Sequence, residues 1–185
     1  MNNCYLDAEA VITFFRMTGR KHIFITGSRG SGKSHLVNNM LKYMSDSFNL
    51  LQSHRTDTPQ VVIKSNLVAD NKEFVIGIPR TSGINPVSKG NNMTIIEDGF
   101  INCAIPAIDT HLDTTPERLF VIDELGYLES SCIPFQKAVE KLLDNSHVLA
   151  VIRKQSTEFL NRICNRKDVL VIDIDNTFET LSCII

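Results

Sequence analysis

The sequence predicts an α/β fold of three layers, in which a mostly parallel sheet is covered by helices on both faces. Four short apolar runs are continuous rather than alternating, as in strands that are buried on both faces; they lie at 22–26, 118–123, 147–152 and 169–174. Between these runs, apolar residues recur every three or four positions, which indicates amphipathic helices. Strands and helices that alternate in this way are typical of a parallel sheet with a helical layer on each side.

The first elements are a helix, a strand and a second helix. We predict a helix over 6–18, because its apolar residues recur at helical spacing and Gly19 can end it. The strand at 22–26 leads into a loop with three glycines. The helical pattern that follows the loop spans about 33–45.

The middle of the chain, 48–118, has a less regular pattern. Three segments are predicted as strands, at 61–65, 73–79 and 92–97. A stretch rich in Gly, Pro, Asn and Ser separates the last two, so they are expected to form a hairpin with a long loop. A short helix is predicted over 105–112. We interpret about 66–105 as a β-hairpin insertion within a single domain that spans 1–185.

The second half alternates clearly between strands and helices. After the strand at 118–123, Pro134 is expected to begin a helix, since proline is favoured in the first helical turn. Ser156 is the predicted cap of a helix between the strands at 147–152 and 169–174. The last residues, 178–185, are predicted to form a short closing helix.

Composition limits the classes of partner. The 185 residues carry a net charge of −2, which lacks the overall basic character of most nucleic-acid binders, so nucleic acid is not indicated. No apolar run approaches the ~18 residues that a membrane span needs. The N-terminal acids precede the first apolar residues, which is the wrong order for a secretory signal. A cytoplasmic protein is therefore expected, and whether it has a protein partner or forms a homo-oligomer stays open.

The cysteines indicate neither disulfides nor a metal site. Their number, five, is odd, and none forms a C-x-x-C pair. We expect them to be small apolar side chains in a reducing compartment.

The segment HIFITGSRGSGKS, 22–34, carries the strongest functional signal. Gly27, Gly32, Lys33 and Ser34 spell G-x-x-x-x-G-K-S between a strand and a helix. Glycines let the backbone approach a ligand closely, and the loop N–H groups and the helix N-terminus attract anions. The lysine adds a charge for the β- and γ-phosphates, and the serine hydroxyl can bind Mg²⁺. The motif therefore predicts a site for a nucleoside triphosphate, such as ATP, with Mg²⁺.

We expect the whole loop to contribute to binding. Arg29 is either a phosphate contact or a solvated side chain. The predicted nucleotide-binding residues are Gly27, Ser28, Arg29, Gly30, Ser31, Gly32, Lys33, Ser34 and His35.

A second motif lies about ninety residues downstream. LFVIDE ends a buried strand with Asp123 and Glu124, at the edge where open parallel sheets bind ligands. Mg²⁺ prefers oxygen ligands, so Asp123 is predicted to serve the metal together with Ser34. Glu124 can polarise a water that attacks the γ-phosphate, which makes it the predicted catalytic base.

These two segments resemble a known family. IFITGSRGSGKSHLV and LFVIDELGYLESSCIPFQKAVEKLLDNSHVLAVI are similar to the small P-loop nucleoside-triphosphatases of the thermophilic, or cancer-related, type. The matching residues of the second segment are Asp123, Glu124, Leu125, Gly126, Glu129, Phe135, Val139 and Leu143. The resemblance is strong over about 22–41 and 117–152. It implies Mg²⁺-dependent hydrolysis of nucleoside triphosphates, with loose base preference, on a P-loop fold of the additional-strand type.

The sequence departs from the family pattern at three places. Ser34 replaces the usual threonine and keeps the hydroxyl. Tyr127 and Leu128 stand where the family tends to have Lys-Met, and 176–178 reads Asn-Thr-Phe where the family often has Asn-Arg-Asp.

Cations near the ends of two other strands are candidates for contact with the γ-phosphate. Arg153 and Lys154 follow the strand at 147–152, and an arginine there could stabilise developing negative charge, so Arg153 joins Lys33 and Glu124 as a predicted catalytic residue. Arg80 is a weaker candidate of the same kind. For each, the alternative is a solvated charge at a strand end.

Two polar segments near the last strand are less convincing. Asn176 could contact a base or ribose, or could simply belong to a turn. NRKD, at 165–168, nearly spells a guanine-specificity motif, but its lysine is one place late and it precedes a strand, so we reject it.

Three functions remain open from the sequence. The first is hydrolysis of nucleoside triphosphates, which Glu124 favours. The second is a nucleotide or nucleoside kinase, with the middle insertion closing over an acceptor. The third is a slow switch, in which bound nucleotide orders that insertion.

Overall fold

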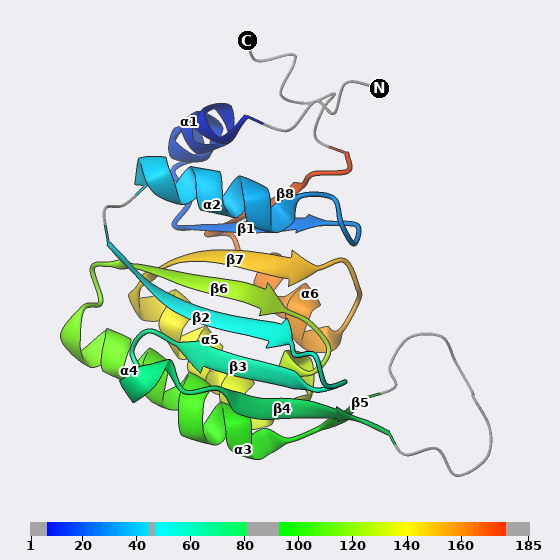
Figure 1. The fold of residues 1–185 in the computed structure, drawn as a ribbon. Coiled ribbons are helices and arrows are strands. Elements are labelled where there is room, and N and C mark those ends of the chain that lie inside the picture. Colours follow the sequence, from blue (N-terminus) through cyan, green and yellow to red (C-terminus); the bar gives the residue numbers. More distant parts are fainter. Residues whose placement is uncertain (1–6, 45–46, 81–92, 177–185) are drawn as a thin grey trace.

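The computed structural model describes residues 7–44, 47–80 and 93–176. Within these ranges, eight strands form one sheet in the order β5-β4-β3-β2-β6-β7-β1-β8, with helices on both faces (Figure 1). The strands are β1 His22–Gly27, β2 Phe48–Arg55, β3 Val61–Ser65, β4 Phe74–Pro79, β5 Met93–Ile95, β6 Leu119–Leu125, β7 His147–Arg153 and β8 Val169–Asp173. The predicted α/β class with a mostly parallel central sheet is confirmed.

The central strands are all parallel. β2 pairs with β6, β6 with β7, β7 with β1, and β1 with β8. β7 therefore separates β1, which leads into the glycine loop, from β6, which carries the acid pair. This extra strand between the two motif-bearing strands is the additional-strand arrangement that the family resemblance implied.

The other half of the sheet is an antiparallel extension. β2 pairs with β3, β3 with β4, and β4 with β5, each in antiparallel register. The strands predicted at 61–65, 73–79 and 92–97 correspond to β3, β4 and β5. The loop between β4 and β5, at 81–92, lies outside the described residues.

Two helical layers cover the sheet (Figure 1). The helical segments are α1 Ala8–Thr18, α2 Lys33–Met44, α3 Glu97–Gly99, the π-helical turn Phe100–Ala104, α4 Ile105–Thr114, α5 Ile133–Asn145 and α6 Glu158–Cys164, with short 3₁₀ turns at Ala69–Asn71 and Glu129–Ser131. Along β1, Ile23 and Ile25 pack with α1 and α2, whereas Phe24 packs with α4, α5 and α6 on the opposite face. Alternate side chains of a fully buried strand thus supply both cores.

The ends of α1 follow from local chemistry. The Asp7 side chain accepts a hydrogen bond from the Ala10 N–H, as an N-cap does. Gly19 has a φ of 64°, the left-handed conformation that often ends helices. The helix predicted at 6–18 is thereby confirmed within the described residues.

The cap of α6 differs from the prediction. Thr157, not Ser156, is the N-cap, and its Oγ1 accepts a hydrogen bond from the Leu160 N–H at 3.1 Å. Ser156 instead accepts from the Asn161 side chain. Both residues are hydroxyl-bearing neighbours, so sequence could not separate them.

The predicted short helix at 105–112 is part of a longer helical segment, 97–114. Pro106 lies in the first turn of α4, where its missing N–H is tolerated. A π-helical turn precedes it, in which the Ile105 N–H bonds to the Phe100 carbonyl five residues back.

The prediction missed strand β2. Its polar residues break the apolar run, yet Asn49 is buried because it has internal partners. The Asn49 Nδ2 donates to His111 Nδ1 and to Thr115 Oγ1, each at 2.8 Å. Burial of a polar group that is hydrogen-bonded costs little, so a polar strand can lie inside the sheet.

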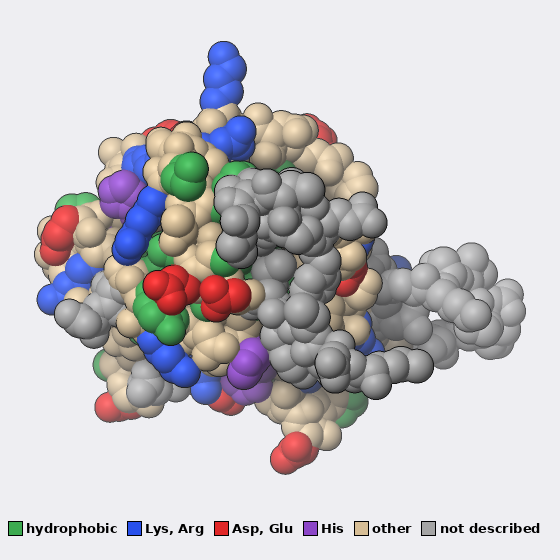
Figure 2. All heavy atoms as spheres, turned by 90° about the horizontal axis from the view of Figure 1, so that it is seen from above, with side chains coloured by type: hydrophobic (Ala, Val, Ile, Leu, Met, Phe, Trp, Pro, Cys, Tyr) green, Lys and Arg blue, Asp and Glu red, His purple; other side chains and the backbone are tan. Residues whose placement is uncertain are grey.

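Seen from above α1 and α2, acidic, basic and apolar side chains are interspersed on the surface (Figure 2). None of the helices among the described residues is both long and apolar enough for a membrane crossing. The helix predicted at 178–185 lies outside the described residues.

Candidate active site

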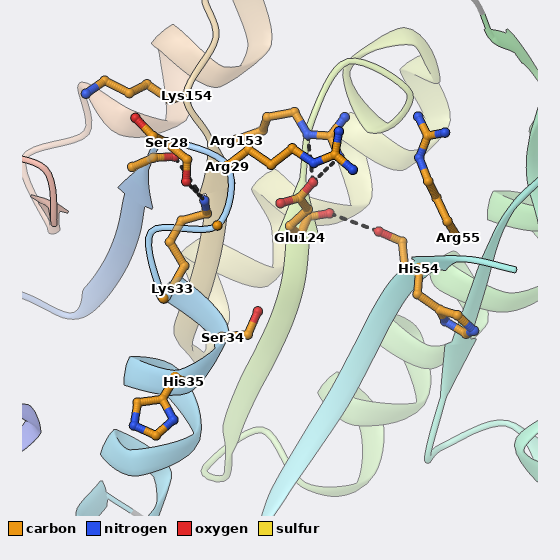
Figure 3. A pocket seen from close by; sticks show the side chains of 14 residues that line it. Ser28, Arg29, Lys33, Ser34, His35, His54, Arg55, Glu124, Arg153 and Lys154 are labelled. Carbon is orange, nitrogen blue, oxygen red and sulfur yellow. Dashed lines mark hydrogen bonds and ion pairs between the residues drawn. The ribbon is translucent and has the colours of Figure 1, made fainter. Parts of the chain in front are cut away.

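The glycine loop between β1 and α2 has the backbone shape that its sequence predicts. Gly27, Gly30 and Gly32 have φ values of 153°, 77° and 91°. At Gly27 a Cβ atom would also come within 2.7 Å of Ile174 Cγ1, so both conformation and space require glycine there. These conformations let the chain turn back tightly between β1 and α2, and Figure 3 shows the curled loop at the start of α2.

Within the loop, Lys33 and Ser31 bond to the loop's own carbonyls. The Lys33 Nζ donates to the Gly27 carbonyl at 2.9 Å and to the Ser28 carbonyl at 2.8 Å. The Ser31 Oγ also donates to the Ser28 carbonyl. These bonds keep the loop curled and hold the ammonium group inside its bend.

A cavity of about 780 Å³ opens in front of the loop. This volume lies within the usual range for a small-molecule site. It is lined by Gly27, Ser28, Arg29, Gly30, Gly32, Lys33, Ser34, His35, Ser53, His54, Arg55, Glu124, Arg153 and Lys154. The structure therefore brings almost all of the predicted loop residues to one cavity, together with the predicted base. Ser31 is not among the lining residues, and its hydroxyl donates to the Ser28 carbonyl.

His35 lies at the margin of this arrangement. Its ring is directed along α2, away from the loop (Figure 3), and its Nε2 is 3.0 Å from the Asn39 side-chain nitrogen. The His35 side chain is thus oriented by its own helix.

Asp123 lies behind the cavity wall, half-buried on β6. It faces Gln52 across the β2–β6 pairing. Burial raises the pKa of Asp123, and the neighbouring charge of Glu124 raises it further; a hydrogen bond with Gln52 and the charge of Lys33 act in the opposite direction. The carboxylate and the loop lysine are therefore electrostatically coupled.

Glu124 projects into the cavity from the end of β6. The β6–β7 register shifts between Asp123 and Leu125, so Glu124 has no partner in that pairing, as at a β-bulge. The Arg153 Nε donates to Glu124 Oε1 at 2.7 Å, and a second guanidinium nitrogen pairs with the same oxygen. The two predicted catalytic side chains thus contact each other (Figure 3).

Lys154 has a different role from its neighbour. Its Nζ pairs with Asp173, the last residue of β8, at 2.9 Å and with Asp175, just beyond it, at 3.0 Å. Asp175 in turn accepts hydrogen bonds from the Ser28 N–H and Ser28 Oγ. Hydrogen bonding to Ser28, and then the contact with Lys154, lower the pKa of Asp175 to about 2. Lys154 therefore helps to brace the loop from outside.

Asn176 belongs to the same turn. Its Nδ2 donates to Asp173 Oδ2 at 2.8 Å, as expected of a turn asparagine.

Glu129 is a buried acid beneath the site. It is 5% exposed and accepts a hydrogen bond from the Gly126 N–H at 2.8 Å. A Cβ at Gly126 would lie 3.3 Å from Glu129 Oε2 and 3.5 Å from Arg153 Nε, so all three residues meet at one point. Burial raises the pKa of Glu129 to about 7, against the lowering effect of its backbone hydrogen bonds and Arg153.

Sequence reasoning missed the contribution of β2 to the site. Ser53, His54 and Arg55 line the cavity, and Ser53 Oγ lies 3.4 Å from the Glu124 carbonyl. Because the strand itself was not predicted, nothing in the sequence placed these residues. Arg80, the weaker candidate for contact with the γ-phosphate, is exposed directly after β4 and does not line this cavity.

The rejected NRKD segment lies at the opposite end of the sheet. The Asp168 carbonyl accepts from the N–H groups of Lys21 and His22, at the start of β1. Arg166 bonds both oxygens of the Asp168 side chain. This segment therefore has no part in the site.

Comparisons with known proteins agree with this geometry. A family model described as NTPase matches residues 22–178. The nucleoside-triphosphatase THEP1 of Thermotoga sp. strain RQ2 is 26% identical over 155 residues, covering 83% of this chain and 86% of that protein. The protein of the same name from Thermotoga maritima is 23% identical over 154 residues, with the same coverage of each chain.

Two solved structures share the fold. The crystal structure of THEP1 from Aquifex aeolicus has a TM-score of 0.64 at 18% identity, covering 89% of this chain and 96% of that one. The solution structure of a human cancer-related nucleoside triphosphatase has a TM-score of 0.60 at 19% identity, covering 89% and 97%.

Proposed function

The chain belongs to the NTPase family, and from this premise we propose that it hydrolyses ATP and other nucleoside 5′-triphosphates, with Mg²⁺, to the diphosphate and phosphate. The observation that carries the proposal is the position of Glu124. It projects into the same cavity as the glycine loop and is held there by Arg153. A loop alone would bind phosphates; an acid opposite it can activate water.

The loop binds the triphosphate through its backbone and Lys33. The Lys33 ammonium now bonds neutral carbonyls of Gly27 and Ser28. Phosphoryl oxygens are charged acceptors, and such hydrogen bonds are about twice as strong as neutral ones. Lys33 can therefore exchange its partners for the β- and γ-phosphates when nucleotide binds.

The chemistry of Ser34 and Asp123 fits a magnesium site. Hydroxyl and carboxylate oxygens, with phosphate oxygens and water, are the ligands that Mg²⁺ prefers. Asp123 is a half-buried acid whose negative charge is opposed by burial and by Glu124, so a nearby cation would favour its ionised form. When bound there, Mg²⁺ would neutralise charge on the phosphoryl oxygens.

Glu124 acts on the attacking water. Both contacts with Arg153 use Oε1, which leaves Oε2 to accept a hydrogen bond from water. Glu124 takes a proton from this water as the water oxygen bonds to the γ-phosphorus. The bond from the γ-phosphorus to the bridging oxygen breaks, and the diphosphate leaves with the electron pair. Arg153 fixes the carboxylate and adds positive charge beside the transferring group.

A steady-state panel tests this function. ATP, GTP, CTP, UTP and their deoxy forms would be compared for phosphate release with Mg²⁺, beside the Lys33→Ala variant. We expect release from several nucleotides, because the described lining of the cavity consists mainly of phosphate-binding and charged residues. If no nucleotide gives more release than Lys33→Ala, the proposal is wrong.

A further inference from the structure

The sheet carries two more arginines to the edge where the glycine loop lies. β2 is parallel to β6, and β4 is antiparallel to β3, which is antiparallel to β2. β4 therefore runs in the same direction as β6. Arg55 at the end of β2 and Arg80 directly after β4 thus extend the edge that carries Glu124.

A small lobe of about 50 Å³ adjoins the main cavity on this side. Its lining includes Arg55, Tyr127, Leu128 and Glu129, and it shares Ser53, His54, Arg55, Glu124 and Arg153 with the main cavity. Arg80 lies outside this lining, farther along the same edge of the sheet. Arg55 lies on the far side of Glu124 from Lys33 (Figure 3). The lobe is therefore a continuation of the site beyond the predicted base.

Positive charge converges on the tyrosine of this lobe. Burial raises the pKa of Tyr127, and the charge of Glu129 raises it further, while the charges of Arg153, Arg55 and Arg80 act to lower it. Arginines that favour a phenolate at one hydroxyl would equally favour an anion bound beside it. The tyrosine hydroxyl can also donate a hydrogen bond to that anion.

The cations of this edge differ in whether an acidic side chain pairs with them. Arg153 forms an ion pair with Glu124, and Lys154 forms ion pairs with Asp173 and Asp175. In the part of the chain that the structure describes, Arg55 and Arg80 form no ion pair or hydrogen bond through their side chains. Two exposed guanidinium groups are thus available beside a site that already has Lys33 for phosphate.

The distance along the sheet separates these arginines from the loop. β1 and β2 are three strand positions apart, and β1 and β4 are five, which corresponds to about 14 Å and about 24 Å. A chain of three phosphoryl groups held at β1 is much shorter than the larger of these distances. Arg80 therefore cannot serve a triphosphate bound on the loop.

We propose that Arg55, Arg80 and Tyr127 form a second anion site, distinct from the nucleotide phosphates, which binds the phosphate group of a second ligand. A phosphate dianion offers several acceptor oxygens to two guanidinium groups and one hydroxyl. The bound phosphate group is either the inorganic phosphate released by hydrolysis at Glu124 or part of a phosphomonoester that binds as a second substrate.

Equilibrium titration tests the site without turnover. The full chain is saturated with Mg²⁺ and the non-hydrolysable β,γ-imido analogue of ATP, so that the loop is occupied, and inorganic phosphate is titrated by calorimetry. We expect one phosphate per chain. Arg55→Met and Arg80→Met should each weaken it about tenfold or more, as loss of a hydrogen bond to a charged group does. Arg16→Met, an exposed arginine on α1, is the matched control and should leave it unchanged.

Two results would overturn the site: no phosphate binding to the loaded chain, or unchanged binding in both arginine variants. Circular dichroism of the variants, whose arginines are exposed, separates loss of the site from loss of the fold. AMP in place of phosphate then identifies the source. AMP binding at least tenfold tighter than phosphate indicates a phosphomonoester substrate, and otherwise the ligand is free phosphate. Failure of hydrolysis itself is seen separately, in the ATP turnover of the unmodified chain.

Discussion

Arg153 on β7 holds the carboxylate of Glu124 on β6, with Nε donating to Oε1 over 2.7 Å. The base is thus oriented before any nucleotide arrives. Glu124 is 23% exposed and Arg153 is 47% exposed, so the pair sits at the cavity wall and not in the core. Both can therefore be replaced without opening a cavity in the hydrophobic core.

Glu124→Gln should keep the binding of ATP with Mg²⁺ and lose most of its hydrolysis. The amide retains the shape of the side chain but cannot accept a proton, and general base catalysis contributes about 10²–10⁴-fold. Single-turnover phosphate release and equilibrium nucleotide binding measure the two effects. Glu9→Gln, an exposed acid on α1, is the control. Unchanged turnover in Glu124→Gln would exclude Glu124 as the base.

Arg153→Met should lower kcat by about tenfold to a hundredfold, the equivalent of one hydrogen bond between charged groups. Arg153→Lys should recover little, since an ammonium cannot reproduce the fork of a guanidinium. In the Glu124→Gln background the same change should cost much less, because the carboxylate it orients is gone. Additive losses in a double-mutant cycle would show that the two residues act independently.

Asp175→Ala should raise the KM for ATP more than it lowers kcat. Asp175 accepts hydrogen bonds from the N–H and hydroxyl of Ser28 and forms an ion pair with Lys154. Its loss would remove the contacts that hold Ser28, near the start of the glycine loop. We expect a change of severalfold in KM, in line with one or two exposed hydrogen bonds. Asp175→Asn, which can still accept from Ser28, is the matched variant and should recover part of the loss. A pure kcat effect would contradict a role in shaping the loop.

Stability should fall as pH rises through the range in which Glu129 ionises. Its pKa is raised from 4.5 to about 7, so the folded chain binds this proton more tightly than the unfolded chain between those values. The free energy of unfolding therefore loses at most about 3 kcal/mol from this group as pH rises from 4.5 to 7. In Glu129→Gln this fall should be absent. Denaturant titrations at pH 5 and pH 8 measure the change in the free energy of unfolding for the unmodified chain and for Glu129→Gln. An equal change in both proteins would refute the prediction.

His22 should act in the opposite direction on acidification. The ring is completely buried at the start of β1, its Nε2 is 3.5 Å from Asp168 Oδ2, and burial lowers its pKa from 6.5 to about 4. The unfolded chain gains this proton first, so stability present above pH 6.5 is lost as pH falls toward 4, by up to about 3 kcal/mol. His22→Phe should flatten that part of the stability profile, whatever its effect at neutral pH.

The central fold and the main motifs were predictable for one reason. The strands β1, β6 and β7 are buried on both faces, so their sequences are continuous apolar runs. β8 has a similar apolar run, although it lies at the edge of the sheet and Val171 is 38% exposed. Because these strands are parallel, the glycine loop after β1 and the acids at the end of β6 are expected at the same edge of the sheet. Lys33, Ser34, Asp123 and Glu124 could be placed by that logic alone.

The rest depended on tertiary partners. Strand β2 can contain polar residues because His111, sixty-two positions away, hydrogen-bonds the buried side chain of Asn49. Since the strand was not predicted, the position of Arg55 at the site was not predicted either. The pairing of Lys154 with Asp175 could not be predicted either, because Asp175 follows a different strand. In each case the deciding contact joins residues whose proximity only the fold creates.

The antiparallel extension of the sheet has a consequence for how such a protein can vary. Between β2 and β4 the chain reverses twice, so an added or deleted pair of strands returns it to the same rim, whereas a single strand would end it at the opposite rim, about 17 Å away for a five-residue strand. Adding or removing strands in pairs therefore keeps the direction of every later strand. The chain could gain or lose a hairpin here and still end each added parallel strand at the edge of the sheet that carries Glu124.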